Sequence, residues 1–274
     1  MKKINRRSFL AAAGLTAAAL ALTACGGSAS STASSTASSA ASSTSAAAEL
    51  TTVEAGKLTM ATNAAFPPYE MTTDAGEFEG IDIDTAKAIA EKLGLELQID
   101  DMDFDAALLS VQQGKADIVM AGVTVTDERK AVMDFSDSYA TGIQSIIVPE
   151  GSDITSPDDL AGKKIGTQRG TTGYIYCSDD FGDDAVVAYD DGLTAVQALN
   201  NGQVDAVVID NAPAQEFVAA NPGLVILDTS YAEEDYAIGM AKGSALEDAV
   251  NAALEELKAD GTLQSIVDKY ITAE

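Results

Sequence analysis

Hydrophobic and polar residues recur along this chain with the periods of strands and helices. Lys57 to Thr62 alternates between the two kinds of residue and predicts a strand, and Leu95 to Ile99 predicts another. Between them, Asp82 to Leu93 places its apolar residues on one face, which predicts an amphipathic helix that ends at Gly94. Strands that alternate with helices in this way favour an α/β fold.

The segment from Asn63 to Glu70 is predicted to be a loop after the first strand. It contains two prolines, and proline cannot donate a hydrogen bond to a neighbouring strand. An aromatic-rich loop at the end of a strand is a candidate ligand contact. The alternative interpretation is that Phe66 and Tyr69 fill the hydrophobic core.

One pattern of helix and strand occurs twice. In residues 107–119 and again in 195–207, a helix ends in glycine, a two-residue loop and an Asp follow, and an apolar strand comes next. Residues 57–63 and 163–169 repeat each other more weakly. Ligands of α/β units bind beyond the carboxyl ends of the strands, so two such units predict a cleft, with Asp210 at the end of one strand. The alternative is that common α/β patterns coincide here by chance.

The segment from Ala116 to Lys130 combines a buried strand, a turn of small residues and the start of a helix. Thr126, followed by two acids, predicts the N-cap, so Arg129 falls in the first helical turn. A helix N-terminus already carries partial positive charge, and a cation there suits a site that receives an anion. The alternative is that Arg129 pairs with Asp127, Glu128 or another surface acid.

A second possible anion site follows further along the chain. Ser156 to Gly162 predicts a short capped helix, Lys163 to Gln168 predicts a strand, and Gly170 to Gly173 opens a helix. Free backbone N–H groups and the hydroxyls of Thr171 and Thr172 would accept a carboxylate there. The same residues also fit a plain helix cap.

The N-terminal segment predicts export and lipid anchoring. Residues 1–24 contain four cations without an acid and an apolar run shorter than the ~20 residues needed to span a bilayer, which indicates a signal peptide. The run ends in a lipobox with Cys25 as the expected lipidated residue, and the paired arginines also fit a twin-arginine signal. Residues 25–56 are expected to form the lipidated cysteine and a flexible tether, because 26–48 contain only Gly, Ser, Ala and Thr.

The composition excludes several classes of function. The formal net charge of the chain is −27, and removal of the four signal-peptide cations leaves −31, so nucleic acid is not an expected partner. The chain has no histidine, no phosphate-binding loop, no G-x-S-x-G motif and no cluster of zinc ligands, and neither a metal nor a cofactor is expected. The only cysteine beyond Cys25 is Cys177, which we expect to be buried rather than reactive.

A set of short motifs carries a resemblance to a known family. The motifs are FPPYE at 66–70, GIDID at 80–84, FDAAL at 104–108, AGVTVTDER at 121–129, DFSDSY at 134–139 and QRGTT at 168–172. From about Lys57 to Tyr270, the chain resembles the extracytoplasmic solute-binding proteins of polar amino-acid ABC transporters. The resemblance implies an α/β, two-lobed periplasmic-binding-protein-like fold of type II, with a ligand cleft between lobes that two hinge strands join. The implied parts are residues 57–140 with 237–274 as lobe 1, 148–231 as lobe 2, and 141–147 with 232–236 as the hinge.

The resemblance also implies roles for individual residues. Arg129 would pair with the α-carboxylate of the ligand, helped by the Thr124 hydroxyl and the helix start at 171–172. Asp210 and the backbone at Gly122 would take the α-ammonium. The expected ligand-binding residues are Asn63, Phe66, Phe104, Ala121, Gly122, Thr124, Arg129, Gln168, Thr171, Thr172 and Asp210.

The side chain of the ligand is less constrained by these motifs. Phe66 and Phe104 would sandwich it, and Gln168, Asn63 or Glu70 would contact its polar end. Cation binders of this family often carry Asp where this chain has Asn63, which disfavours a strongly cation-selective pocket. A polar amino acid is therefore expected, without a choice among glutamine, cystine, arginine or another.

The implied function is transport. A monomer, lipid-anchored to the outer face of the cell membrane, would capture a polar L-amino acid and deliver it to an ABC transporter permease by lobe closure, without acting as an enzyme. Two alternatives stay open: an enzyme on the same fold, such as a dehydratase of cyclic amino-acid precursors, or a surface adhesin. The set of Arg129, Thr124 and Asp210 favours capture of an amino acid over its turnover.

Overall fold

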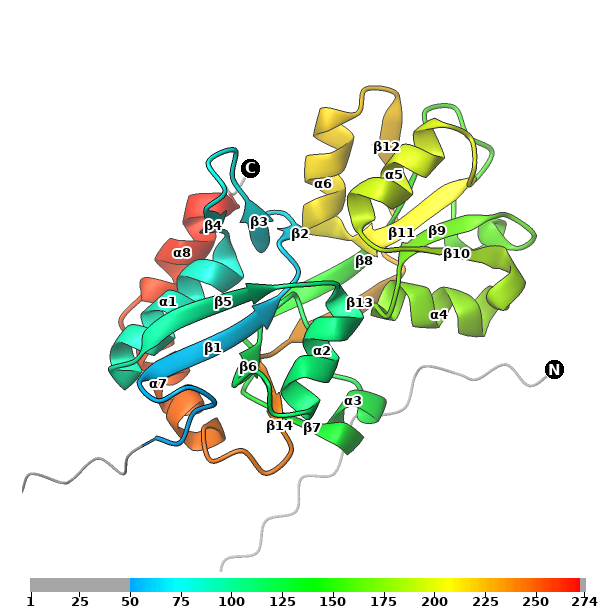
Figure 1. Cartoon of the computed structure of the whole chain (residues 1–274). Helices are drawn as coiled ribbons and strands as arrows, with labels where there is room; N and C mark the ends of the chain where they lie inside the picture. Colours follow the sequence, from blue (N-terminus) through cyan, green and yellow to red (C-terminus); the bar gives the residue numbers. More distant parts are fainter. Residues whose placement is uncertain (1–49, 272–274) are drawn as a thin grey trace, which may run out of the picture. The chain divides into compact units, whose positions relative to one another are not determined.

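The computed structural model describes residues 50–271, which form two mixed β-sheets flanked by helices (Figure 1). The predicted signal peptide, Cys25 and most of the predicted tether lie outside the described residues. No helix within 50–271 has both the length and the apolar character that a membrane crossing requires. The sequence predicts a tether up to residue 56, but the Val53 N–H already donates to Asp117 at 2.7 Å, so contact with the first sheet begins earlier.

The first sheet has the strand order β5-β1-β6-β14-β7, in which β1 pairs in parallel with β5 and β6. Its strands are β1 (Lys57–Thr62), β5 (Glu96–Asp101), β6 (Ile118–Val119), β7 (Met133–Phe135) and β14 (Gly239–Ala241). The helices of this part are α1 (Ile81–Leu93), α2 (Phe104–Gln112), α3 (Asp127–Val132), α7 (Glu247–Ala259) and α8 (Thr262–Tyr270). The alternation predicted for β1 places Leu58 and Met60 in the cluster with α1 and α7, whereas Ala61 packs with α2.

The second sheet has the order β10-β9-β11-β8-β12, in which β9 pairs in parallel with β10 and β11. Its strands are β8 (Ala140–Pro149), β9 (Ile165–Gln168), β10 (Val186–Tyr189), β11 (Ala206–Asp210) and β12 (Leu224–Ile226). The helices of this part are α4 (Thr172–Phe181), α5 (Gly192–Asn200), α6 (Asn211–Ala220), and the 3₁₀ turns η1 (Pro157–Leu160) and η2 (Asp183–Ala185).

The repeat predicted from the sequence is present in the structure. The helix–strand pair α2–β6 lies beside β1 in the first sheet, and α5–β11 lies beside β9 in the second. Both helices end before a glycine with a positive φ, 65° at Gly114 and 66° at Gly202, a conformation that suits glycine at a helix end. The two segments therefore occupy equivalent places.

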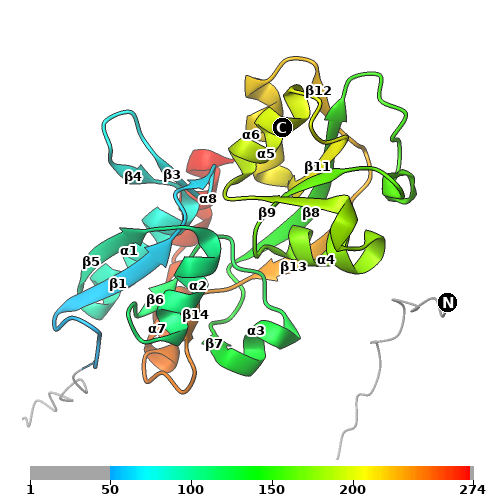
Figure 2. The ribbon, with the colours of Figure 1, turned by 45° about the vertical axis from the view of Figure 1, so that its right-hand side comes forward.

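Two antiparallel strands connect the sheets. The first part of β8 pairs with β13 (Ala232–Tyr236), from Ala140 opposite Tyr236 to Gln144 opposite Ala232, and the later part of β8 pairs with β11 and β12. Figures 1 and 2 show β8 and β13 running side by side between the two sheets. The chain thus leaves the first sheet along β8 and returns along β13.

The loop predicted from Asn63 to Glu70 is only partly a loop. It contains β2 (Ala65–Phe66) and the start of β3 (Glu70–Thr72), which form a small sheet with β4 (Phe78–Glu79). The prediction was wrong here because both prolines lie in the turn between β2 and β3, where no N–H is needed for the ladder.

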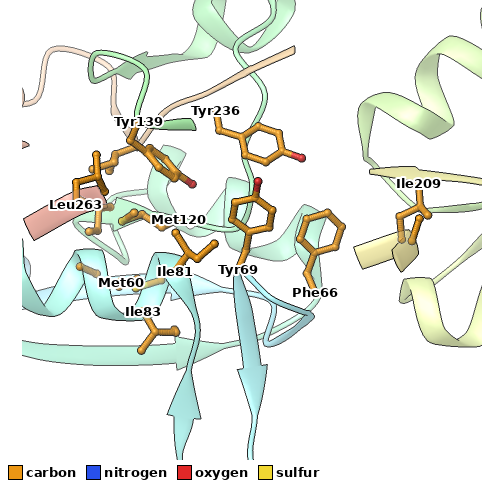
Figure 3. Packing of buried hydrophobic residues seen from close by; sticks show 14 of the residues in the cluster. Met60, Phe66, Tyr69, Ile81, Ile83, Met120, Tyr139, Ile209, Tyr236 and Leu263 are labelled. Carbon is orange, nitrogen blue, oxygen red and sulfur yellow. The ribbon is translucent and has the colours of Figure 1, made fainter. Parts of the chain in front are cut away.

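Aromatic side chains pack at the centre of the core. The Tyr69 and Tyr236 rings meet edge to face at 5.3 Å between centroids, and Phe66 stacks beside Tyr69 at 6.0 Å (Figure 3). All three are buried, so the core interpretation of Phe66 and Tyr69 is correct for their packing. Cys177 is also buried, as predicted, and burial raises the pKa of its thiol to about 12.

Candidate ligand-binding site

One pocket is lined by every ligand-binding residue that the sequence predicts, from Asn63 to Asp210. These residues follow the carboxyl ends of β1, β6, β9 and β11 or open the helices beside them, as expected for α/β units. The pocket is also lined by Glu70, which the sequence analysis offers as an alternative side-chain contact, and by three residues that it does not name: Gln144, Val208 and Ile209. The two sheets contribute to it together.

Arg129 lies at this pocket through the start of α3. The Thr126 side chain caps that helix, as predicted, by accepting a hydrogen bond from the Arg129 N–H at 3.1 Å. The guanidinium donates to the Thr124 carbonyl at 2.8 Å and to the Gly170 carbonyl at 3.1 Å, and its central carbon lies 5.4 Å from the centroid of the Phe104 ring. Because Gly170 belongs to the second sheet's side, one guanidinium contacts both halves of the pocket.

Arg129 is a buried cation without a carboxylate partner. Its exposed fraction is 8%, and within residues 50–271 none of the ion pairs includes it. Burial lowers the pKa of Arg129, and the charge of Glu234 acts in the opposite direction. The alternative that Arg129 pairs with Asp127, Glu128 or another surface acid is therefore wrong. A guanidinium has five N–H donors, so several remain for an anion.

Asp210 faces the pocket from the second sheet. It ends β11, is 6% exposed, and accepts a hydrogen bond from the Gln144 amide at 2.5 Å. Burial raises the pKa of Asp210 to about 7, and the nearby Glu234 charge adds to this, whereas the neighbouring Tyr236 hydroxyl and the hydrogen bond from Gln144 oppose it. A cation placed beside this carboxyl would favour its ionised form.

Glu234 is another residue of this region that the sequence prediction missed. It lies on β13 and is 6% exposed, and its Oε2 atom accepts hydrogen bonds from Thr124 Oγ1 at 3.1 Å, Thr172 Oγ1 at 3.0 Å and Gln144 Nε2 at 3.0 Å. The resemblance implied that the Thr124 hydroxyl helps to hold the ligand carboxylate. In the structure this hydroxyl donates its hydrogen to Glu234 instead.

Two amide side chains meet across the pocket. Gln168 Nε2 donates to Asn63 Oδ1 at 2.8 Å, and Asn63 Nδ2 donates to the Met102 carbonyl at 3.0 Å. Gln168 Nε2 also donates to the Asp190 carbonyl at 3.3 Å, which uses both of its hydrogens, whereas Asn63 Nδ2 keeps one hydrogen. Lone pairs on the two amide oxygens remain as acceptors. Phe66 and Phe104, both buried, line the same pocket, so Phe66 belongs to the core and to the pocket at once.

The buried carboxyl group of Asp82 supports the turn at Gly122, and the buried Glu70 carboxyl lies close to Asp82. Asp82 accepts hydrogen bonds from the Gly122 N–H at 3.0 Å and from the Tyr139 hydroxyl at 2.8 Å. Burial raises the pKa of Asp82 to about 6, and burial next to Asp82 raises the pKa of Glu70 well above its ordinary range. The Glu70 carboxyl is therefore favoured in its neutral form, which makes it a poor partner for a cationic side chain.

The arrangement has the chemistry of a binding pocket. One buried guanidinium and one buried carboxyl lie at the same cavity, with hydroxyls, amides and two aromatic rings around them. Within residues 50–271, no three His, Cys, Asp or Glu side chains gather in a way that would hold a metal ion. The polar groups are thus placed to receive a small solute that carries both signs of charge.

Comparison with known proteins places this geometry in a family. Residues 58–273 match the family model described as "Bacterial extracellular solute-binding proteins, family 3". The chain is 33% identical to a probable histidine-binding protein of Neisseria gonorrhoeae, over 99% of this chain and 98% of that one. It is 32% identical to the L-cystine-binding protein TcyJ of Escherichia coli K12, over 81% of this chain and 85% of the relative.

A solved structure agrees in fold as well as in sequence. The solved structure of an ancestral arginine-binding protein bound to glutamine is 43% identical to this chain and superposes with a TM-score of 0.76, over 80% of this chain and 99% of that one. The two sheets of the described residues accordingly form the two lobes of the type II periplasmic-binding fold. This chain is a member of the bacterial extracellular solute-binding proteins of family 3.

Proposed function

We propose that this protein captures a free, polar L-amino acid outside the cytoplasmic membrane and presents it to the permease of an ABC transporter. The observation that carries the proposal is the placement of Arg129 and Asp210 at one pocket, on different sheets. Both side chains are buried, and within residues 50–271 neither belongs to an ion pair.

An amino-acid zwitterion supplies what each of these two groups lacks. Its α-carboxylate would pair with the guanidinium of Arg129, whose planar donors match a carboxylate in bidentate geometry. Its α-ammonium would pair with Asp210. Because an unpaired charge in a dry pocket costs several kcal/mol, a ligand with only one of the two charges binds more weakly.

Closure of the lobes follows from the same pairing. Arg129 and Asp210 lie on different lobes, so a ligand that bridges them favours the state in which the lobes approach. We assign residues 57–140 with 237–274 to lobe 1, 148–231 to lobe 2, and 141–147 with 232–236 to the hinge. The antiparallel pair β8–β13, which links the two sheets, supports this assignment.

The side chain of the ligand is polar in this proposal. Asn63 and Gln168 offer amide oxygens at the pocket, and Phe66 with Phe104 offers two aromatic faces. The relatives described above are named for histidine, cystine and arginine, and the ancestral protein holds glutamine. All of these ligands are α-amino acids with polar or sulfur-containing side chains, and all carry the zwitterion that Arg129 and Asp210 would bind.

The cellular setting comes from the N-terminal segment. A signal peptide over residues 1–24, lipidation of Cys25 and a flexible tether would hold a monomer at the outer face of the membrane, close to the permease. Relatives are named as binding proteins, and we propose no reaction for this pocket.

Calorimetric titration tests the proposal. The protein from Gly26 onward keeps all described residues; it is freed of carried-over ligand by unfolding and refolding, and then titrated with the common L-amino acids and cystine. We expect saturable binding of one or a few polar amino acids. If no amino acid binds to the refolded protein, the proposal that the protein captures amino acids is wrong.

A further inference from the structure

Glu234 lies next to the pocket without lining it. Its carboxylate is buried on the returning hinge strand β13, and one oxygen accepts hydrogen bonds from three donors. Two of these donors, Thr124 and Thr172, belong to different lobes, and both line the pocket, as does the third donor, Gln144. The carboxylate therefore acts on pocket residues rather than on the pocket's contents.

These hydrogen bonds determine which polar groups of the pocket act as donors and which act as acceptors. A hydroxyl has one hydrogen, and a carboxylate can only accept, so Thr124 and Thr172 direct their hydrogens to Glu234 and keep lone pairs for the pocket. The Gln144 amide donates to Glu234, to Asp210 and, at 3.5 Å, to the Thr172 hydroxyl, whose oxygen still has a second lone pair. The Gln144 amide oxygen has no partner among the described residues.

The result is a part of the pocket that offers acceptors. The Thr124 and Thr172 oxygens, the Gln144 oxygen and the Asp210 carboxyl lie around the network that Glu234 organises. An ammonium group carries three donors and no acceptor, so it is complementary to this region, whereas a carboxylate is not. Arg129, whose guanidinium donates to the Thr124 carbonyl, remains the donor for an anion.

We propose that Glu234 is a positioning residue for the α-ammonium of the ligand: by holding the hydroxyl hydrogens of Thr124 and Thr172, it turns both oxygens into acceptors for that ammonium. The inference rests on the proposed capture of an amino acid. It assigns the Thr124 hydroxyl to the ammonium end of the ligand, and it leaves the carboxylate to Arg129 and to the backbone at the start of α4.

The same contacts allow one alternative interpretation, which predicts the opposite effect on affinity when the Glu234 charge is removed. Glu234 would then stand in for the carboxylate of an absent ligand and compete with it for the two hydroxyls. Removal of its charge would in that case strengthen the binding of amino acids. Under our proposal, removal of the charge weakens it.

The test measures binding by Glu234→Gln, with Glu233→Gln as the matched control. Glu233 is the exposed neighbour on the same strand, so the control removes the same charge without touching the network. The probe is whichever of L-arginine, L-glutamine, L-histidine and L-cystine binds the parent protein most tightly, together with its analogue that lacks the α-amino group. For arginine the analogue is 5-guanidinopentanoic acid, and for glutamine it is 4-carbamoylbutanoic acid, each measured by displacement.

We expect Glu234→Gln to lower the affinity for the amino acid by roughly tenfold or more, because hydrogen bonds to charged groups are strong. The affinity for the des-amino analogue should change by less than about threefold. Glu233→Gln should change neither. The loss should also be non-additive with Thr124→Val, since Glu234 acts through that hydroxyl. Urea midpoints of all variants separate weaker binding from loss of the fold.

The outcomes are distinguishable. If the parent protein binds none of the four amino acids, the proposed function fails and this inference fails with it. If the parent binds but Glu234→Gln binds equally well or more tightly, only the positioning role is wrong. Equal losses for the amino acid and for its des-amino analogue would likewise overturn the assignment of Glu234 to the ammonium.

Discussion

Arg129 combines a role in the pocket with a role in holding the pocket together. Its guanidinium donates to carbonyl oxygens of Thr124 and Gly170 and lies over the Phe104 ring, yet it has no carboxylate partner within the described residues. The carbonyl contacts orient the planar group in advance, so little conformational entropy is lost when an anion arrives. Substitution should therefore affect binding more than stability.

We expect Arg129→Ala to weaken amino-acid binding by about 2–5 kcal/mol, because the ligand carboxylate is then buried without a partner. The same change leaves two carbonyl groups without their donor, which should lower the free energy of unfolding by about 1–3 kcal/mol. Calorimetry and urea denaturation measure the two effects. Complete loss of the fold would mean that Arg129 serves structure first, and Arg129→Lys, which keeps the charge, should bind better than the alanine variant.

Asp210 should make binding depend on pH. Burial raises its pKa to about 7, so below that pH the carboxyl is protonated and cannot pair with an ammonium. We expect affinity for glutamine, which does not titrate in this range, to fall about tenfold for each pH unit below 7 and to level off above it. Calorimetry from pH 5 to 8 measures this dependence. The Asp210→Asn variant lacks the titrating carboxyl, so its affinity should vary less with pH.

The stability of the ligand-free protein should show the opposite trend. A carboxyl whose pKa is higher in the folded state than its ordinary value of 3.8 binds its proton more tightly when folded. Its contribution to stability is therefore complete below about pH 4 and is lost as pH rises through about 7. Urea midpoints of the parent protein and of Asp210→Asn isolate this contribution, and identical pH profiles for the two proteins would rule it out.

Short motifs allowed the pocket residues to be predicted, but they could not reveal the network behind them. Arg129, Thr124 and Asp210 follow strand ends, where a local pattern indicates a site. Glu234 and Gln144 lie inside strands β13 and β8, among ordinary strand residues, and only the pairing of these strands brings them to the threonines. The direction of a hydroxyl hydrogen depends on such partners and has no sequence signal.

At the level of elements, the pair β8–β13 places glycine where two side chains need room. A Cβ added to Gly142 would lie 2.6 Å from Asp210 Oδ1 and 2.6 Å from the Tyr236 ring. We expect Gly142→Ala to lower the free energy of unfolding by about 1–3 kcal/mol and to weaken amino-acid binding, since both neighbours must shift. Thr141→Ala, at the exposed neighbouring position, is the control in the same denaturation and titration series.

Helices and strands with clear periodicity were predicted well, and short strands were not. The Asp82 to Leu93 helix and the repeated helix–strand units appear in the structure within a residue or two. The strands β2 and β4 each contain two residues, too few for a periodic pattern. They exist because tertiary pairing with β3 supplies their hydrogen bonds.

The whole molecule carries far more acidic than basic side chains, 43 against 16. Repulsion among these acids opposes the compact state, and salt screens charges that lie farther apart than about 10 Å at 0.1 M. We expect the melting temperature of the ligand-free protein to rise by a few degrees between 10 and 200 mM NaCl. Circular dichroism measures the shift; a decrease would mean that the exposed ion pairs outweigh the repulsion.

The connection between the sheets has a consequence for how the chain can be divided. Ala140 and Tyr236 are paired neighbours, so the segment from 141 to 235 starts and finishes beside one pair of residues, where the chain leaves the strands of the first sheet and returns to them. A short turn that joins these two residues would leave the strands of the first sheet in their present order. Residues 141–235 are therefore an insertion in the first lobe, and another domain whose two ends lie close together could replace them.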